Sequence, residues 1–186
     1  MKEIILAAEK FCNENIPSNR IKSHYLKHIS LVRHYGQTLA REYNANQEIV
    51  DLAAILHDMG AEQGEVHAQA SADIAKNFFK KFKIKKDDLD NIIIVIANHS
   101  SKKPGKPYKE DVTLETKIMR DADALSFFDD TYIGYYQKKI ETMASDSAKK
   151  VTLEKMIQMK QKITTPLGLQ LANDKYQAAV KYFDSI

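Results

Sequence analysis

Cysteine, long apolar runs and a signal-like N-terminus are rare or missing in this chain of 186 residues. The single cysteine, Cys12, excludes an intramolecular disulfide framework and a zinc site built from several cysteines. The longest apolar run is 92–97, whereas a membrane-spanning helix needs roughly 18 apolar residues or more. The first residues also lack the apolar core of a signal peptide. We therefore expect a cytoplasmic protein without membrane contacts.

An excess of charge of one sign is also missing, because 28 lysines and arginines are set against 25 aspartates and glutamates. A nucleic-acid-binding domain usually concentrates its positive charge on one face. Here the lysines are dispersed, apart from clusters at 80–86 and 102–109. The net charge of +3 therefore does not predict nucleic-acid binding.

Glycine and proline are scarce, at six and four residues, and strand-like alternation is almost absent. Apolar residues instead recur with helical spacing, with a clear interruption at 100–111. Residues that favour helix starts precede four of the helical segments: Ser18, Asn46, Thr113 and Thr165. Gly60 stands where a helix stop is expected. The pattern predicts an all-α, single-domain bundle of seven or eight helices over 1–186.

The histidines, six in all, are the other distinctive feature, since any metal site must be built from them and from carboxylates. His57 and Asp58 are adjacent at the end of the most apolar helical segment. Burying them is unfavourable unless a divalent cation pairs with the carboxylate and accepts the imidazole lone pair. The alternative is a solvated helix end.

Further histidines and aspartates occupy similar positions in other helical segments. His28 lies on an apolar helix face, His67 begins a helix and His99 ends one. Asp121 and Asp123 lie within a later helix. Each is compatible with ordinary packing, but their recurrence on the apolar side or inner end of five consecutive helices favours a shared site.

The order His28, His57–Asp58 and then a late aspartate resembles the HD-domain superfamily of metal-dependent phosphohydrolases. Three segments carry the resemblance: 28–32, the apolar helix 49–60 with its His-Asp end, and 117–125. The similarity covers about 20–130, the expected metal-binding core. Residues 140–186 lie outside this similarity. We expect them to form a C-terminal helical extension, whose role is either to close the site or to form a homo-oligomer.

The family pattern Ala-Asp-x-Leu matches 122–125, so the resemblance implies Asp123 as the last ligand. Asp121 points roughly 200° away on a helix and is expected to support or cap instead. The implied ligands are His28, His57, Asp58, His67, His99 and Asp123. They suit either two metals bridged by Asp58, or one metal with His67 and His99 left to contact a phosphate.

The resemblance implies hydrolysis of a phosphomonoester or phosphodiester, on a nucleotide or small phosphoester, by a metal-activated water. The metal can be Mn, Mg, Co, Zn, Ni or Fe. Expected catalytic residues are Asp58, His57 and Glu62, and expected substrate-binding residues are Lys102, Lys103 and His24. Two alternatives remain: an HD-type di-iron oxygenase, and a non-catalytic domain that binds a nucleotide or a partner.

Overall fold

The structure, a computed structural model, describes residues 1–100 and 112–185. Within these ranges all regular secondary structure is helical, which confirms the all-α prediction. The elements are α1 Lys2–Glu14, α2 Lys22–Glu42, α3 Gln47–Leu56, the 3₁₀ helix η1 Ala61–Val66, α4 His67–Phe79, α5 Lys86–Asn98, α6 Leu114–Ser126, the π-helical turn η2 Phe127–Thr131, α7 Tyr132–Ile140, α8 Ser145–Lys160 and α9 Pro166–Asp184.

The described residues form nine α-helices, so the predicted count of seven or eight was too low. The helix that Thr113 was predicted to start is α6, which ends at Ser126. Asp129 then leaves the helical conformation, with φ −85° and ψ −145°, and α7 begins as a separate helix. Helical periodicity in the side chains does not reveal this local change of backbone direction.

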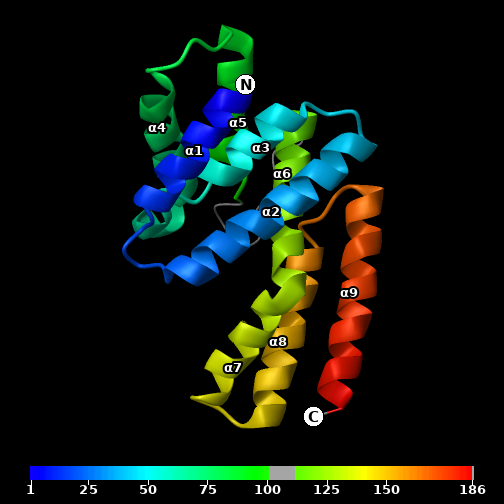
Figure 1. The fold of residues 1–186 in the computed structure, drawn as a ribbon. Coiled ribbons are helices and arrows are strands. Elements are labelled where there is room, and N and C mark those ends of the chain that lie inside the picture. The colour runs from blue at the N-terminus through cyan, green and yellow to red at the C-terminus, as the bar shows by residue number, and fades with distance from the viewer. Residues whose placement is uncertain (101–111, 186) are drawn as a thin grey trace.

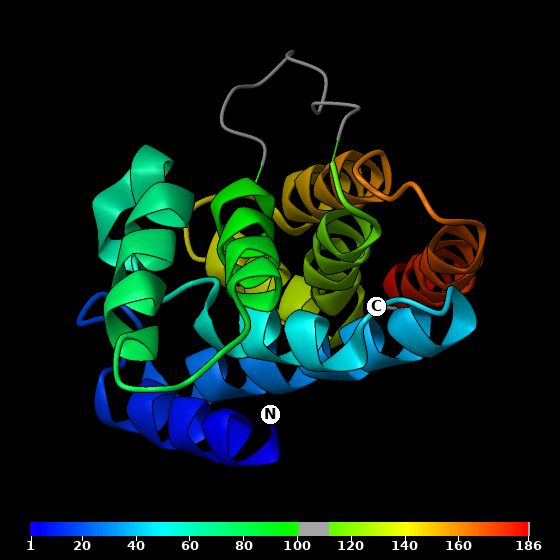
Figure 2. The same ribbon diagram turned by 90° about the horizontal axis from the view of Figure 1, so that it is seen from above.

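The long helix α2 organises the fold. It packs against α3 and α6, while α4 packs on α5 and α5 on α3 (Figure 1). Seen from above, α4, α5 and α6 lie side by side across α2 and α3 (Figure 2). This arrangement brings the end of α3, the start of α4 and the end of α5 close to the face of α2.

The C-terminal helices α7, α8 and α9 lie on the other side of α2 from α1 and α4 (Figure 1). One cluster of buried apolar residues nevertheless extends from Ile4 in α1 to Ala179 in α9. This shared core is consistent with a single domain over 1–186, and the domain assignment stays a prediction. Among the described helices, none combines the length and apolar character needed to cross a membrane.

Three of the four predicted helix caps are confirmed. The side chain of Asn46 accepts hydrogen bonds from two amides of α3, Thr113 caps α6, and Thr165 caps α9 just before Pro166. The Ser18 cap was wrong, because α2 begins four residues later without a side-chain cap. The backbone amide of Ser18 donates instead to the Glu62 carboxylate, which holds it in the loop between α1 and α2.

Gly60 acts through close packing, since α3 has already ended at Leu56. A Cβ added at Gly60 would lie only 2.6 Å from the backbone nitrogen of Ser71 and 2.8 Å from the carbonyl oxygen of His67. The Gly60 amide also donates to Ser71 Oγ at 2.9 Å. The glycine therefore lets the turn that carries His57 and Asp58 lie directly against the start of α4.

Candidate metal centre

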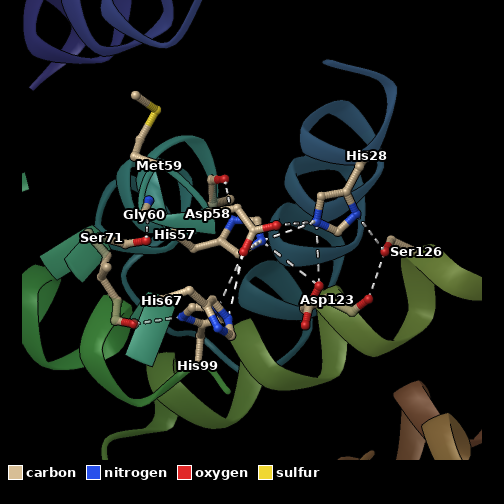
Figure 3. Close-up of polar contacts among 12 residues, drawn as sticks. His28, His57, Asp58, Met59, Gly60, His67, Ser71, His99, Asp123 and Ser126 are labelled. Atoms are coloured by element: carbon tan, nitrogen blue, oxygen red, sulfur yellow. Dashed lines mark hydrogen bonds and ion pairs between the residues drawn. The ribbon is translucent and has the colours of Figure 1, made fainter. Parts of the chain in front are cut away.

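The six side chains predicted as ligands come together at one place (Figure 3). His28 comes from α2, and Asp123 from α6. His28 Nε2 lies 3.1 Å from His57 Nε2 and 3.5 Å from Asp123 Oδ1. His57 Nε2 lies 3.9 Å from the same Asp123 oxygen. These three side chains form one half of the cluster.

Asp58 connects this half to the other. Its Oδ2 lies 3.9 Å from His28 Nε2, while its Oδ1 lies 3.8 Å from the Nε2 atoms of both His67 and His99. Two triplets result, His28–His57–Asp58 and Asp58–His67–His99, each with ligand atoms within 4.8 Å of one another. Because Asp58 belongs to both, its carboxylate is common to two groups of side chains that could each hold a metal ion.

Backbone carbonyls orient three of the histidines. The Nδ1 atoms of His57, His67 and His99 lie 2.9, 2.8 and 2.7 Å from the carbonyl oxygens three residues earlier. Each histidine directly follows a helix, where the last carbonyls lack helical partners. A carbonyl oxygen only accepts, so each Nδ1 carries the proton and each Nε2 presents a lone pair. Metal-binding histidines are typically oriented in this way.

The donor set fits a divalent cation. The Nε2 lone pairs of His57, His67 and His99 face the Asp58 carboxylate. None of these four groups carries a proton that it could donate to another. Such lone pairs repel one another unless a positive charge lies among them. Imidazole and carboxylate together suit Mn, Fe, Co, Ni and Zn. The residues present therefore fit the group that the sequence resemblance implied.

Electrostatics keep the cluster in its metal-binding protonation state. Burial raises the pKa of the Asp58 carboxyl, but charge interactions with the neighbouring histidines and Arg20, which act at the acid pH where this carboxyl titrates, outweigh burial and lower the pKa to about 2. Burial lowers the pKa of His99 to about 4 and also lowers the pKa of His28. At neutral pH the carboxylate is ionised and these two imidazoles are neutral, as metal coordination requires.

Arg20 is a site residue that the sequence did not suggest. Its Nη2 lies 3.4 Å from Asp58 Oδ2, at the end of the loop between α1 and α2. The Asn19 side chain donates to the Ala61 carbonyl at 3.2 Å, which holds this loop against η1. The one available signal was an arginine in the turn just before the helix that carries His28.

Arg120 and Ser126 were also missed, and both contact the segments that carry ligands. Arg120 Nε donates to the Asn98 carbonyl at 2.8 Å, which fixes the end of α5 beside His99. Ser126 Oγ lies 3.1 Å from His28 Nδ1. Neither contact leaves a trace in the hydrophobic pattern, because each joins residues far apart in the chain.

Of the four remaining predicted residues, Glu62 and His24 lie outside the cluster. The Glu62 carboxylate is on the surface and accepts from Ser18, and that hydrogen bond lowers its pKa. His24 is exposed on α2, one turn before His28. Lys102 and Lys103 lie outside the described residues. Catalytic and substrate-binding roles for these four stay predictions.

Asp121 and Asp123 have different surroundings, although only one residue separates them in the sequence. The fully buried Asp121 carboxylate accepts from the Thr164 and Thr165 amides at 2.9 and 2.8 Å, at the start of α9. It therefore attaches the last helix to α6, whereas Asp123 faces the histidines.

Comparison with known proteins agrees with this geometry. The HD domain model matches residues 25–127. YpgQ of Bacillus subtilis (strain 168) is 26% identical over 112 residues, or 60% of this chain and 55% of that protein, so the match spans about half of the curated relative.

Solved structures show the same fold. YpgQ of Bacillus subtilis in complex with ADP has a TM-score of 0.73 at 17% identity, covering 99% of this chain and 93% of that chain. An HD-superfamily hydrolase from Bacillus thuringiensis has a TM-score of 0.74 at 17% identity, covering 99% and 95%. The matched HD segment contains more than half of the chain and all six clustered residues. The chain therefore belongs to the HD domain family.

Proposed function

We propose that the chain is a metal-dependent phosphohydrolase that hydrolyses a phosphoester of a nucleotide or of a small phosphorylated molecule. The observation that carries this proposal is the convergence of four histidines on Asp58, a carboxylate common to two metal-binding triplets. The similar fold of HD-superfamily hydrolases supports hydrolysis. The ADP bound to YpgQ supports a nucleotide as the substrate class.

In the two-metal arrangement, His28, His57, Asp58 and Asp123 would hold one ion. Asp58, His67 and His99 would hold the other. A bound divalent metal supplies a water nucleophile at neutral pH and polarises a phosphoryl oxygen. The chain's own contribution is a set of neutral imidazoles with oriented lone pairs and one shared carboxylate, which fix where the phosphoester must lie.

Arg20 is suited to hold the anionic substrate. Its contact with Asp58, at 3.4 Å, is longer than the roughly 2.7–2.9 Å of a strong charge-assisted hydrogen bond. The partly exposed guanidinium can therefore donate to a phosphate oxygen beside the metal ligands. Lys102, Lys103 and His24 are proposed as further contacts, and Glu62 as a proton acceptor, since its lowered pKa makes it unsuited to act as an acid.

The test combines metal analysis with a substrate panel. Purified chain is reconstituted separately with Mn²⁺, Mg²⁺, Co²⁺, Zn²⁺, Ni²⁺ and Fe²⁺, and phosphate or pyrophosphate release is measured from nucleotides, cyclic nucleotides and small phosphoesters. His57→Ala is expected to lose activity and bound metal while keeping its helical circular dichroism. The matched control is His34→Ala, which removes an exposed histidine of α2. Equal activity of the two variants would contradict the proposal.

Metal analysis, together with assays of oxygen uptake and of nucleotide binding, separates the alternatives. Two irons per chain with oxygen uptake and no phosphate release would favour the di-iron oxygenase. Nucleotide binding without stoichiometric metal or turnover would favour a non-catalytic binding domain.

Arg20→Gln is expected to raise KM for the phosphorylated substrate by roughly 10–100-fold, because a hydrogen bond to a charged group contributes about 1.5–3 kcal/mol. Metal content should stay unchanged. Arg41→Gln, which removes an exposed arginine of α2, is the control. Steady-state kinetics check the prediction, and an unchanged KM in Arg20→Gln would exclude Arg20 from substrate binding.

A further inference from the structure

His28 differs from the other three histidines in where its Nδ1 atom finds a partner. His57, His67 and His99 each follow a helix and bond a carbonyl of the preceding turn. His28 lies within α2, where carbonyls are engaged in the helix's own hydrogen bonds. Its Nδ1 lies instead 3.1 Å from Ser126 Oγ, at the last residue of α6 (Figure 3).

The hydroxyl of Ser126 is placed to accept a hydrogen bond from Nδ1 of His28. Ser126 Oγ donates its single proton to the Asp123 carbonyl oxygen at 2.7 Å, and that oxygen cannot donate in return. The oxygen of the hydroxyl therefore has lone pairs for His28 and no proton. Ser126 is 2% exposed, so bulk water does not readily replace it.

We propose that Ser126 is a positioning residue that sets the tautomer of His28 and joins it to Asp123. Nδ1 of His28 donates to Ser126, which leaves the Nε2 lone pair for an ion that His28 would share with His57 and with Asp123, whose Oδ1 lies 3.5 Å away. The same hydroxyl is bonded to the backbone of Asp123, so one group fixes two ligands from different helices. The inference rests on the proposed metal site, because Nε2 of His28 faces acceptors on His57 and Asp123 and presents a lone pair there only when a cation lies between them.

The experiment reads the tautomer in the protein reconstituted with diamagnetic Zn²⁺. Long-range ¹H–¹⁵N NMR at neutral pH is expected to show His28 protonated at Nδ1 in the wild type. In Ser126→Ala, part of the population is expected to shift to the Nε2-protonated form, which cannot bind the metal. Thr152→Ala is the control, because it removes another fully buried hydroxyl, one that donates to the Ala148 carbonyl in α8. A wild-type His28 protonated at Nε2 overturns the proposal even if Ser126→Ala does not fold.

Metal titration supplies the second measurement. Ser126→Ala is expected to weaken binding of Mn²⁺ by about 10–100-fold, with Ser126→Thr restoring it and Thr152→Ala leaving it unchanged. A purely structural role would lower the melting temperature without changing the tautomer or the affinity, and would overturn the proposal. Failure of the wild type to bind any metal would contradict the proposed function, whereas a wild type that binds metal and a Ser126→Ala variant that binds it equally well would contradict the role of Ser126 alone.

Discussion

Asp58→Asn is expected to abolish metal-dependent phosphate release and to reduce the bound metal of both triplets together. Asp58 is the one residue common to them, with its two oxygens directed at His28 on one side and at His67 and His99 on the other. The amide has nearly the same shape but lacks the negative charge that offsets a divalent cation. Because a catalytic metal contributes several kcal/mol to transition-state stabilisation, the rate should fall on the order of 10³-fold or more.

The same substitution should leave the metal-free fold intact. The buried carboxylate has no short hydrogen bond within the cluster, its contact with Arg20 being 3.4 Å, so the amide removes little favourable interaction. Circular dichroism and thermal unfolding check this. Asp73→Asn, which neutralises an exposed carboxylate on α4, is the control and should keep full activity. Metal-dependent turnover retained in Asp58→Asn would rule out the shared carboxylate as the centre of the site.

Asp121→Ala is expected to lose stability and Asp123→Ala to lose metal affinity, although the two residues are nearly adjacent. Asp121→Ala leaves the buried amide of Thr165 and the partly buried amide of Thr164 without their acceptor. Each unsatisfied buried donor costs about 1–3 kcal/mol, so unfolding free energy should fall by roughly 2–4 kcal/mol. For a chain of this size that lowers the melting temperature by about 5–15 °C.

Asp123→Ala should instead lower metal affinity and activity with little change in melting temperature. Its Oδ1 faces His28 and His57 at 3.5 and 3.9 Å and is partly exposed. Thermal unfolding of both metal-free variants, followed by metal titration, gives the comparison. If Asp121→Ala loses metal while remaining fully stable, the ligand assignment made here is reversed.

The helical nature of the fold was predictable because the apolar spacing repeats along almost the whole chain. The caps at Asn46, Thr113 and Thr165 were predictable for a local reason, since each side chain bonds an amide two or three residues later. Ser18 shows the limit of this reasoning. Its amide is bound by Glu62, a residue distant in sequence, and so the helix start moved.

The clustering of the six side chains was predictable only because their motifs follow one another in the order typical of the HD-domain family. Spacing alone left His28 compatible with an ordinary core histidine. Arg20 and Ser126 could not be found, because their contacts depend on how a loop and a helix end meet residues in other helices. The turn at Asp129 was missed for a different reason: side-chain periodicity carries no information about a single non-helical ψ.

The central claim, that this cluster holds a catalytic divalent metal, is tested most directly by metal content. Wild-type chain and Asp58→Asn are stripped with chelator, reconstituted with Mn²⁺ and other divalent ions, desalted and analysed by inductively coupled plasma mass spectrometry beside a phosphate-release assay. The wild type is expected to retain one or two ions per chain and to hydrolyse substrate in proportion to them, and the variant to retain neither metal nor activity. A wild-type chain without stoichiometric metal, or a variant that retains as much as the wild type, would contradict the claim.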